Sequence, residues 1–144
     1  MPQKVIAVIA KILTGLERLR DVALLVPRVF MAKVFFLSGL TKFNDWSNTL
    51  FLFAEEYKVP IIPFGVAAVM ATAAELLCPV LLVLGLGTRA AALALLGMTG
   101  VIQFTYLDHA DHYYWAMLLG LLLCFGAGRL SLDYPVRRIF LPTS

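Results

Sequence analysis

This sequence has few charged residues. Asp, Glu, Lys and Arg make up 15% of its 144 residues, whereas 61% of the residues are hydrophobic. A soluble globular protein carries about 25% charged and about 45–50% apolar residues, and a soluble domain of this length could not cover so much apolar surface. The composition therefore predicts an integral membrane protein, with the lipid bilayer as the solvent around most of it.

Motifs that hold cofactors are missing as well. The two cysteines, Cys78 and Cys124, form no C-x-x-C pair, and no glycine-rich nucleotide-binding, Walker, H-E-x-x-H or haem-attachment pattern occurs. The histidines, His109 and His112, lie in a short polar loop outside the apolar segments, which argues against haem ligands within a bundle. We expect no metal centre and no intrinsic cofactor. The basic residues do not gather with aromatic residues, so we expect no nucleic-acid partner.

The apolar residues gather into four segments, at about 22–41, 63–84, 89–107 and 113–127. A helix that crosses a bilayer needs about 20 mostly apolar residues, and lipid offers no hydrogen bonds to an irregular backbone. The sequence therefore predicts an all-α fold: a single integral membrane domain over 1–144, built as a four-helix bundle.

The two ends of the chain have a different character. In residues 1–21 the apolar side chains form one helical stripe with the lysines off it, which is typical of an amphipathic helix lying in the membrane interface. An extra helix packed on the bundle is the alternative. No cleavage site follows, so we expect the first span to act as an uncleaved signal. Residues 128–144 are expected to form a cytoplasmic tail.

The basic residues also predict an orientation. Eight of the 12 Lys and Arg residues lie in the N-terminal segment, the turn before residue 90 and the tail. Because short cytoplasmic loops carry an excess of Lys and Arg, both termini are expected in the cytoplasm. The expected location is the cytoplasmic (inner) membrane of a bacterium, as a multi-pass protein.

Three ionisable residues fall inside the predicted spans: Arg28, Lys33 and Glu75. Each costs at least ~2.5 kcal/mol at the bilayer centre, so such residues are usually paired or functional. The distances of Arg28 and Glu75 from the cytoplasmic ends of their helices, estimated from residue counts, favour an ion pair between them. Lys33 either joins this pair or reaches to the membrane interface. Gln103 is expected to bond across helices or to face the same site. The group predicts either a structural bridge or a polar pocket that binds a ligand or relays a proton; no catalytic residue can be named.

Three blocks of sequence, taken together, resemble the DoxX family of small four-span membrane proteins. They are "PRVFMAKVFFLSGLTKF" at 27–43, "AAELLCPVLLVLGLGTRAAAL" at 73–93 and "FGAGRLSLD" at 125–133. The resemblance implies a four-helix membrane bundle associated with redox chemistry. It also carries over four further polar residues as a structural motif: Lys42, Arg89, Ser131 and Asp133. Lys42 is expected at the outer interface. Thr88, which precedes Arg89, is expected to cap a helix, and Ser131 to cap a final short helix with Asp133 in its first turn.

Two functions follow as hypotheses, and whether the protein is an enzyme stays open. The first is a redox-associated subunit that binds a lipophilic, quinone-like molecule near Arg28 and Glu75, with a redox protein and a second copy of the chain as the partners considered. The alternative is a non-catalytic scaffold or assembly factor for a redox or stress-response complex. A transporter ranks lowest because no inverted repeat is visible.

Overall fold

A computed structural model describes the backbone of residues 2–105 and 108–140. The described residues form helices and no strand, so the predicted all-α fold is confirmed. The elements follow in the order α1 (Pro2–Asn44), α2 (Trp46–Leu52), the π-helical turn η1 (Phe53–Tyr57), α3 (Phe64–Leu84), α4 (Thr88–Thr105), α5 (Ala110–Phe125) and α6 (Asp133–Phe140).

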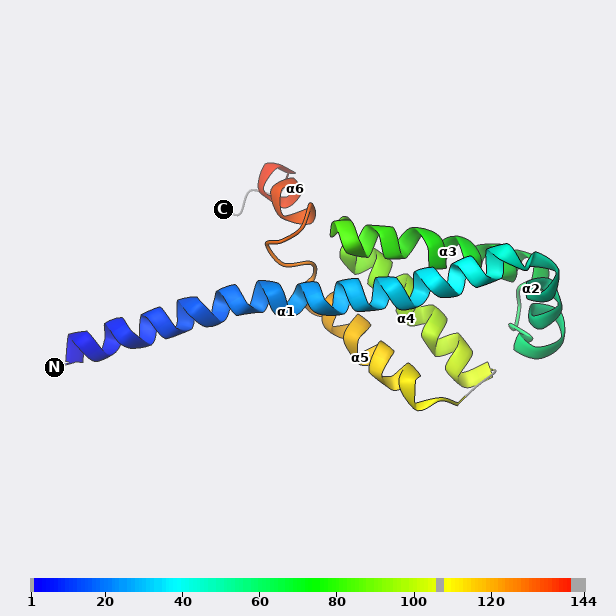
Figure 1. Cartoon of the computed structure of the whole chain (residues 1–144), viewed down its shortest axis with the longest axis horizontal. Helices are drawn as coiled ribbons and strands as arrows, with labels where there is room; N and C mark the ends of the chain where they lie inside the picture. Colours follow the sequence, from blue (N-terminus) through cyan, green and yellow to red (C-terminus); the bar gives the residue numbers. More distant parts are fainter. Residues whose placement is uncertain (1, 106–107, 141–144) are drawn as a thin grey trace.

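The first helix is the longest element, with 43 residues. Its C-terminal half packs against α3 and α5, whereas its N-terminal half extends beyond the bundle (Figure 1). The expected boundary between residues 1–21 and the first span is absent, because the junction is rich in Leu, Arg and Ala, which favour a continuous helix. A separate N-terminal helix is therefore not formed, and contact of this segment with the membrane interface stays a prediction.

Helices α3, α4 and α5 cover the other three predicted apolar segments, with ends that differ by a few residues. The predicted ends at 107 and 144 lie outside the described residues. Within the described part of the chain, Val5–Asn44 and Phe64–Leu84 are long and apolar enough to cross a membrane, and Ala110–Phe125 is apolar but shorter.

The core lies where the C-terminal half of α1 meets α3, α4 and α5. Its buried residues are Met31, Ala32, Phe35, Leu82, Ala91, Ala92, Leu95, Leu119 and Leu122. Helix α1 approaches α3 closely at Gly39, where a Cβ atom would lie 3.0 Å from Cβ of Glu75. Glycine thus lets the two backbones come close, as small residues do at helix contacts in membranes.

The outward faces of the bundle are apolar too. Val66, Leu77 and Val80 on α3 are between 47% and 64% exposed, and Leu93 on α4 and Met117 on α5 are similarly open. Soluble monomers rarely expose apolar surface that runs continuously along several helices. These faces are suited to contact with lipid.

The connection between α1 and α3 folds over the end of the bundle that carries Lys42. Asp45 caps α2 by accepting a hydrogen bond from the Asn48 amide at 3.1 Å. Beyond α2, Phe53 packs on Ala67 and Ala68 of α3 as a second small core. The connection between α1 and α3 thereby closes one side of a cavity next to Lys42 and Glu75.

Candidate functional site

The buried carboxylate of Glu75 is paired with Lys42. The Lys42 ammonium donates to both carboxylate oxygens, at 2.9 and 2.7 Å, and to the Ser38 hydroxyl at 2.8 Å. The side chain of Glu75 is 2% exposed and that of Lys42 15%. The chain therefore contains a buried ion pair at Glu75, but its cation is Lys42 and not the predicted Arg28.

The predicted pair of Arg28 with Glu75 is wrong, and helix geometry explains why. Side chains on an α-helix lean toward its N-terminus. Since α1 and α3 are antiparallel, Arg28 leans toward one end of the bundle and Glu75 toward the other. Arg28 lies opposite Leu82, which is about 10 Å along the axis from Glu75. Lys42 leans back toward Glu75, and the close approach at Gly39 brings it within reach.

The Arg28 guanidinium is instead hydrogen-bonded by backbone carbonyl groups. It donates to the carbonyls of Leu82 and Val83 at the end of α3, each at 2.8 Å. It also donates to Ala127 at 3.0 Å and Leu130 at 2.7 Å. The last carbonyls of a helix lack partners within the helix and carry its negative partial charge, so they suit a buried cation.

The three sequence blocks that resemble the DoxX family meet around the Arg28 guanidinium. Gly85 ends α3 with a φ of 66°, and a side chain there would meet both Arg28 and Ser131. The Asp133 carboxylate accepts from the amides of Gly87 at 2.7 Å and Thr88 at 3.1 Å. These contacts tie the first span, the turn before α4 and the segment after α5 into one structure.

Two expectations about capping are corrected here. Thr88 does not cap α4: it is the first residue of the helix, its amide donates to Asp133, and its buried hydroxyl has no hydrogen-bond partner among the described residues. Ser131 does not cap α6 either, since its hydroxyl donates to the Gly128 carbonyl at 2.6 Å and accepts from no amide of the described part of α6. Asp133 does lie in the first turn of α6, as expected. The side chain of Arg89 donates to the Cys124 carbonyl at 3.0 Å and so joins α4 to α5.

Next to the Lys42–Glu75 pair lies an apolar cavity of about 300 Å³. Among the described residues that line it, Lys42 and Glu75 alone carry charge. The others come from η1 and the loop after it, from α3 and from α4: Phe53, Tyr57, Val59, Ile62, Ala67, Met70, Ala71, Ala74, Ala94, Met98, Val101, Ile102 and Thr105. Such a space, with polar groups at one place, has the character of a small-molecule site.

The rim of this cavity reaches the outer face of the bundle. Met70 on α3 is 58% exposed and Val101 on α4 is 41% exposed, although both also line the cavity. An elongated apolar molecule could therefore place one end beside Lys42 and Glu75 while the remainder stays among lipid chains.

The remaining predicted site residues lie elsewhere. Lys33 is exposed on the surface of α1. Gln103 does not line the cavity; its amide nitrogen donates to Asp108 and its amide oxygen lies 2.7 Å from Nδ1 of His112. It thus links the end of α4 to the start of α5. Of the four residues predicted to bind a ligand, Glu75 alone lines the cavity, and Lys42 was assigned only a motif role.

A signal for Lys42 was present in the sequence. Ser38, Gly39 and Lys42 lie on one face of α1 at helical spacing, so the small residues mark the contact surface and place the lysine on it.

Comparison with known protein families gives the deciding observation: the DoxX family model matches residues 23–108. The chain belongs to the DoxX family.

A relative from Haemophilus influenzae, described as an uncharacterized protein, is 32% identical over 133 residues, covering 83% of this chain and 86% of its own length. No solved structure matches. The region matched by the DoxX model includes Arg28, Lys42 and Glu75. Together with its apolar helices, membership of the DoxX family makes this chain a membrane protein.

Proposed function

We propose that the cavity beside Lys42 and Glu75 binds the polar end of a lipophilic, quinone-like molecule, and that the protein acts as the membrane subunit of a redox system. The observation that carries the proposal is the ion pair at the wall of an otherwise apolar space of about 300 Å³. This volume is at the lower end of the range for ligand pockets, about 300–1,000 Å³, and suits a single ring with its tail outside.

The chemistry of the pair matches both forms of such a ligand. The Lys42 ammonium can donate to a ring carbonyl in place of the Ser38 hydroxyl, which it contacts in the structure. The Glu75 carboxylate can accept from the hydroxyl of the reduced ring. Because most of the residues that line the cavity are apolar, these polar contacts are strengthened and orient the ring. Electrons would come from a redox protein partner, with which the chain associates alone or as a homo-oligomer.

The proposed location is the bacterial inner membrane, with several spans and both termini in the cytoplasm. The folded chain separates its basic residues by position: Arg20, Arg89, Arg129 and Arg137 line one end of the bundle. Lys42 lies at the other end of α1, beyond Glu75. An excess of arginine at one end supports a cytoplasmic assignment for that end.

The test uses a pair of matched substitutions on neighbouring residues of α3. Ala74 lines the cavity, whereas Ala73 is exposed on the outer face of the same helix. We expect a short-chain benzoquinone to raise the melting temperature of the detergent-purified protein and of Ala73→Leu. Ala74→Leu fills the cavity and should abolish the shift while leaving the ion pair intact. Equal shifts in both variants, or none in the unmodified protein, would disprove binding in this cavity.

A scaffold role is the second candidate, and a separate observation favours it. The N-terminal half of α1 extends beyond the bundle (Figure 1), and its apolar residues, among them Val5, Ile9, Ile12 and Leu16, are at least half exposed. Such a surface could bind the apolar face of a partner helix. Under this reading Ala74→Leu leaves the activity of the partner complex unchanged, and polar substitutions at Ile9 and Leu16 reduce it.

A further inference from the structure

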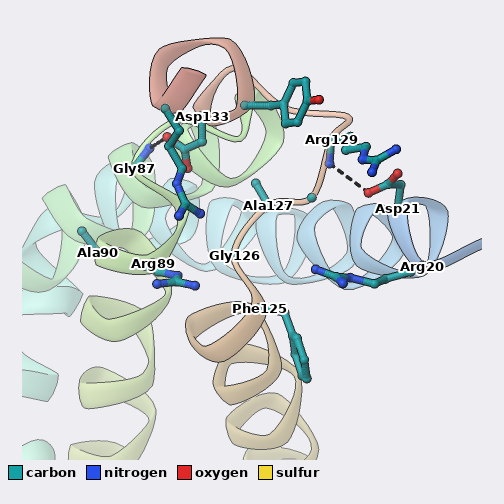
Figure 2. A pocket seen from close by; sticks show the side chains of 13 residues that line it. Arg20, Asp21, Gly87, Arg89, Ala90, Phe125, Gly126, Ala127, Arg129 and Asp133 are labelled. Carbon is teal, nitrogen blue, oxygen red and sulfur yellow. Dashed lines mark hydrogen bonds between the residues drawn. The ribbon is translucent and has the colours of Figure 1, made fainter. Parts of the chain in front are cut away.

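The second large cavity lies at the opposite end of the bundle from the Lys42–Glu75 pair. It has a volume of about 680 Å³ and is bounded by the end of α5, the turn that follows it, the starts of α4 and α6, and residues 20 and 21 of α1. Figure 2 shows Arg89 and Arg20 on either side of the Gly126–Ala127 turn. We call this space the arginine basin; its charged residues are Arg20, Asp21, Arg89, Arg129, Asp133 and Arg137.

The carboxylates of the arginine basin are engaged with backbone amides. Asp21 accepts from the Arg129 amide at 2.9 Å, and Asp133 accepts from Gly87 and Thr88. Within the described part of the chain, neither carboxylate lies within 4.0 Å of an arginine side-chain nitrogen. The basin therefore has an excess of positive charge that the protein's own carboxylates do not pair.

The arginines fall into two groups. Arg89 is held by the Cys124 carbonyl, and the Arg20 guanidinium lies 6.0 Å from the centre of the Phe125 ring. These contacts hold the side chains of Arg89 and Arg20 at the wall of the arginine basin. Among the described residues, the side chains of Arg129 and Arg137 have no hydrogen-bond partner. Arginine matches phosphate oxygens with a planar set of donors, and two fixed and two free cations suit one anion between them.

We propose that the arginine basin binds a phosphate ester, and that its source is the headgroup of an anionic phospholipid. The location favours the lipid over a soluble phosphate. The basin opens where the apolar helices end, and its neighbours Leu130, Leu132, Val136, Ile139 and Phe140 are between 41% and 74% exposed. Helix α6 carries Arg137 and Arg138 among these apolar residues, which is typical of a helix in the membrane interface. Basic pockets between spans on the cytoplasmic side bind such headgroups.

The experiment measures lipid binding to the full-length protein in detergent by native mass spectrometry. The probes are dioleoyl phosphatidylglycerol, dioleoyl phosphatidylethanolamine as the zwitterionic comparison, and glycerol 1-phosphate as the soluble ester. The variant is Arg129→Gln with Arg137→Gln. The control is Lys33→Gln with Lys58→Gln, which removes the same charge from exposed residues outside the basin.

We expect phosphatidylglycerol to bind more tightly than phosphatidylethanolamine. Each arginine near an anionic headgroup accounts for roughly a fivefold change in affinity, so the basin variant should lose roughly 25-fold and the control less than about twofold. Higher salt should weaken binding to the unmodified protein, a readout that needs no variant. Equal losses in variant and control, or no salt dependence, would overturn the site. Displacement of the lipid by an equal concentration of glycerol 1-phosphate would overturn the lipid as its source.

Discussion

At the scale of the residue, two buried charges are stabilised in different ways. Arg28, 1% exposed, is surrounded by four carbonyl oxygens and takes part in holding the chain together. Glu75, also 1% exposed, has a single cationic partner and faces a cavity. The difference is chemical: helix ends supply carbonyl groups to a cation, whereas a carboxylate in mid-helix needs a donor from another side chain. Arg28 is thus suited to structure and Glu75 to ligand binding.

The ion pair gives the first prediction. Lys42→Met should destabilise the protein strongly, because removing one partner of a buried pair typically costs on the order of 3–5 kcal/mol. The combined variant Lys42→Met with Glu75→Gln should regain most of that loss, since it leaves no unpaired charge. Thermal unfolding in detergent, arranged as a double-mutant cycle, measures the coupling.

Lys33→Met is the matched control for this cycle. Lys33 is exposed on the same helix, so its loss should change the melting temperature little. If Lys42→Met behaves like Lys33→Met, the ion pair does not stabilise the bundle.

At the scale of the element, the packing of α1 on α3 decides where the charges meet. Gly39 lies against the backbone and Cβ of Glu75, and the register set there places Lys42 beside the carboxylate. The end of α3 is then opposite Arg28. One helix contact therefore determines both the ion pair and the carbonyl contacts.

Gly39→Val should accordingly destabilise the bundle by about 1–3 kcal/mol, the usual cost of overpacking. The physical reason is that a Cβ at this position would lie 3.0 Å from Cβ of Glu75 and from Cδ2 of Leu76. The same substitution at Gly97 of α4 is the control, because no atom lies within 4 Å of a Cβ there. Thermal unfolding of the two variants provides the comparison, and equal melting temperatures would contradict the close contact.

At the scale of the whole molecule, the two cavities occupy opposite ends of the bundle. The apolar cavity is lined by Lys42 and Glu75, and the arginine basin lies between the end of α5 and the starts of α4 and α6. This separation would place a lipophile and an anionic headgroup at different depths of the same membrane.

The predicted orientation can be tested with single cysteines in a background where Cys78 and Cys124 are replaced by alanine. Ser47→Cys lies just beyond the Lys42 end of α1, and Gly15→Cys lies on its extended N-terminal half; both positions are exposed. A membrane-impermeant maleimide should label the first in intact spheroplasts and the second only after lysis, because an excess of arginine marks the cytoplasmic end. The reverse pattern would contradict the proposed orientation.

The sequence by itself determined the class of structure and the approximate helices. Long apolar segments in a chain with 15% charged residues have no stable form in water, and lipid permits them to be helical. It also singled out Arg28, Lys33 and Glu75, because charged residues are rare in apolar segments; Arg28 and Glu75 are buried, whereas Lys33 is exposed.

The tertiary structure alone decided the partners of those charges. Depth along a helix can be estimated from residue counts, but the contact at Gly39 and the N-terminal lean of side chains set which groups meet. The carbonyls that hold Arg28 belong to Leu82, Val83, Ala127 and Leu130, and every residue type carries a backbone carbonyl. No pattern of side chains in the sequence can therefore predict which carbonyl groups bind Arg28. Only the folded chain, with α1 against α3 and the turn after α5, brings those oxygens to one place.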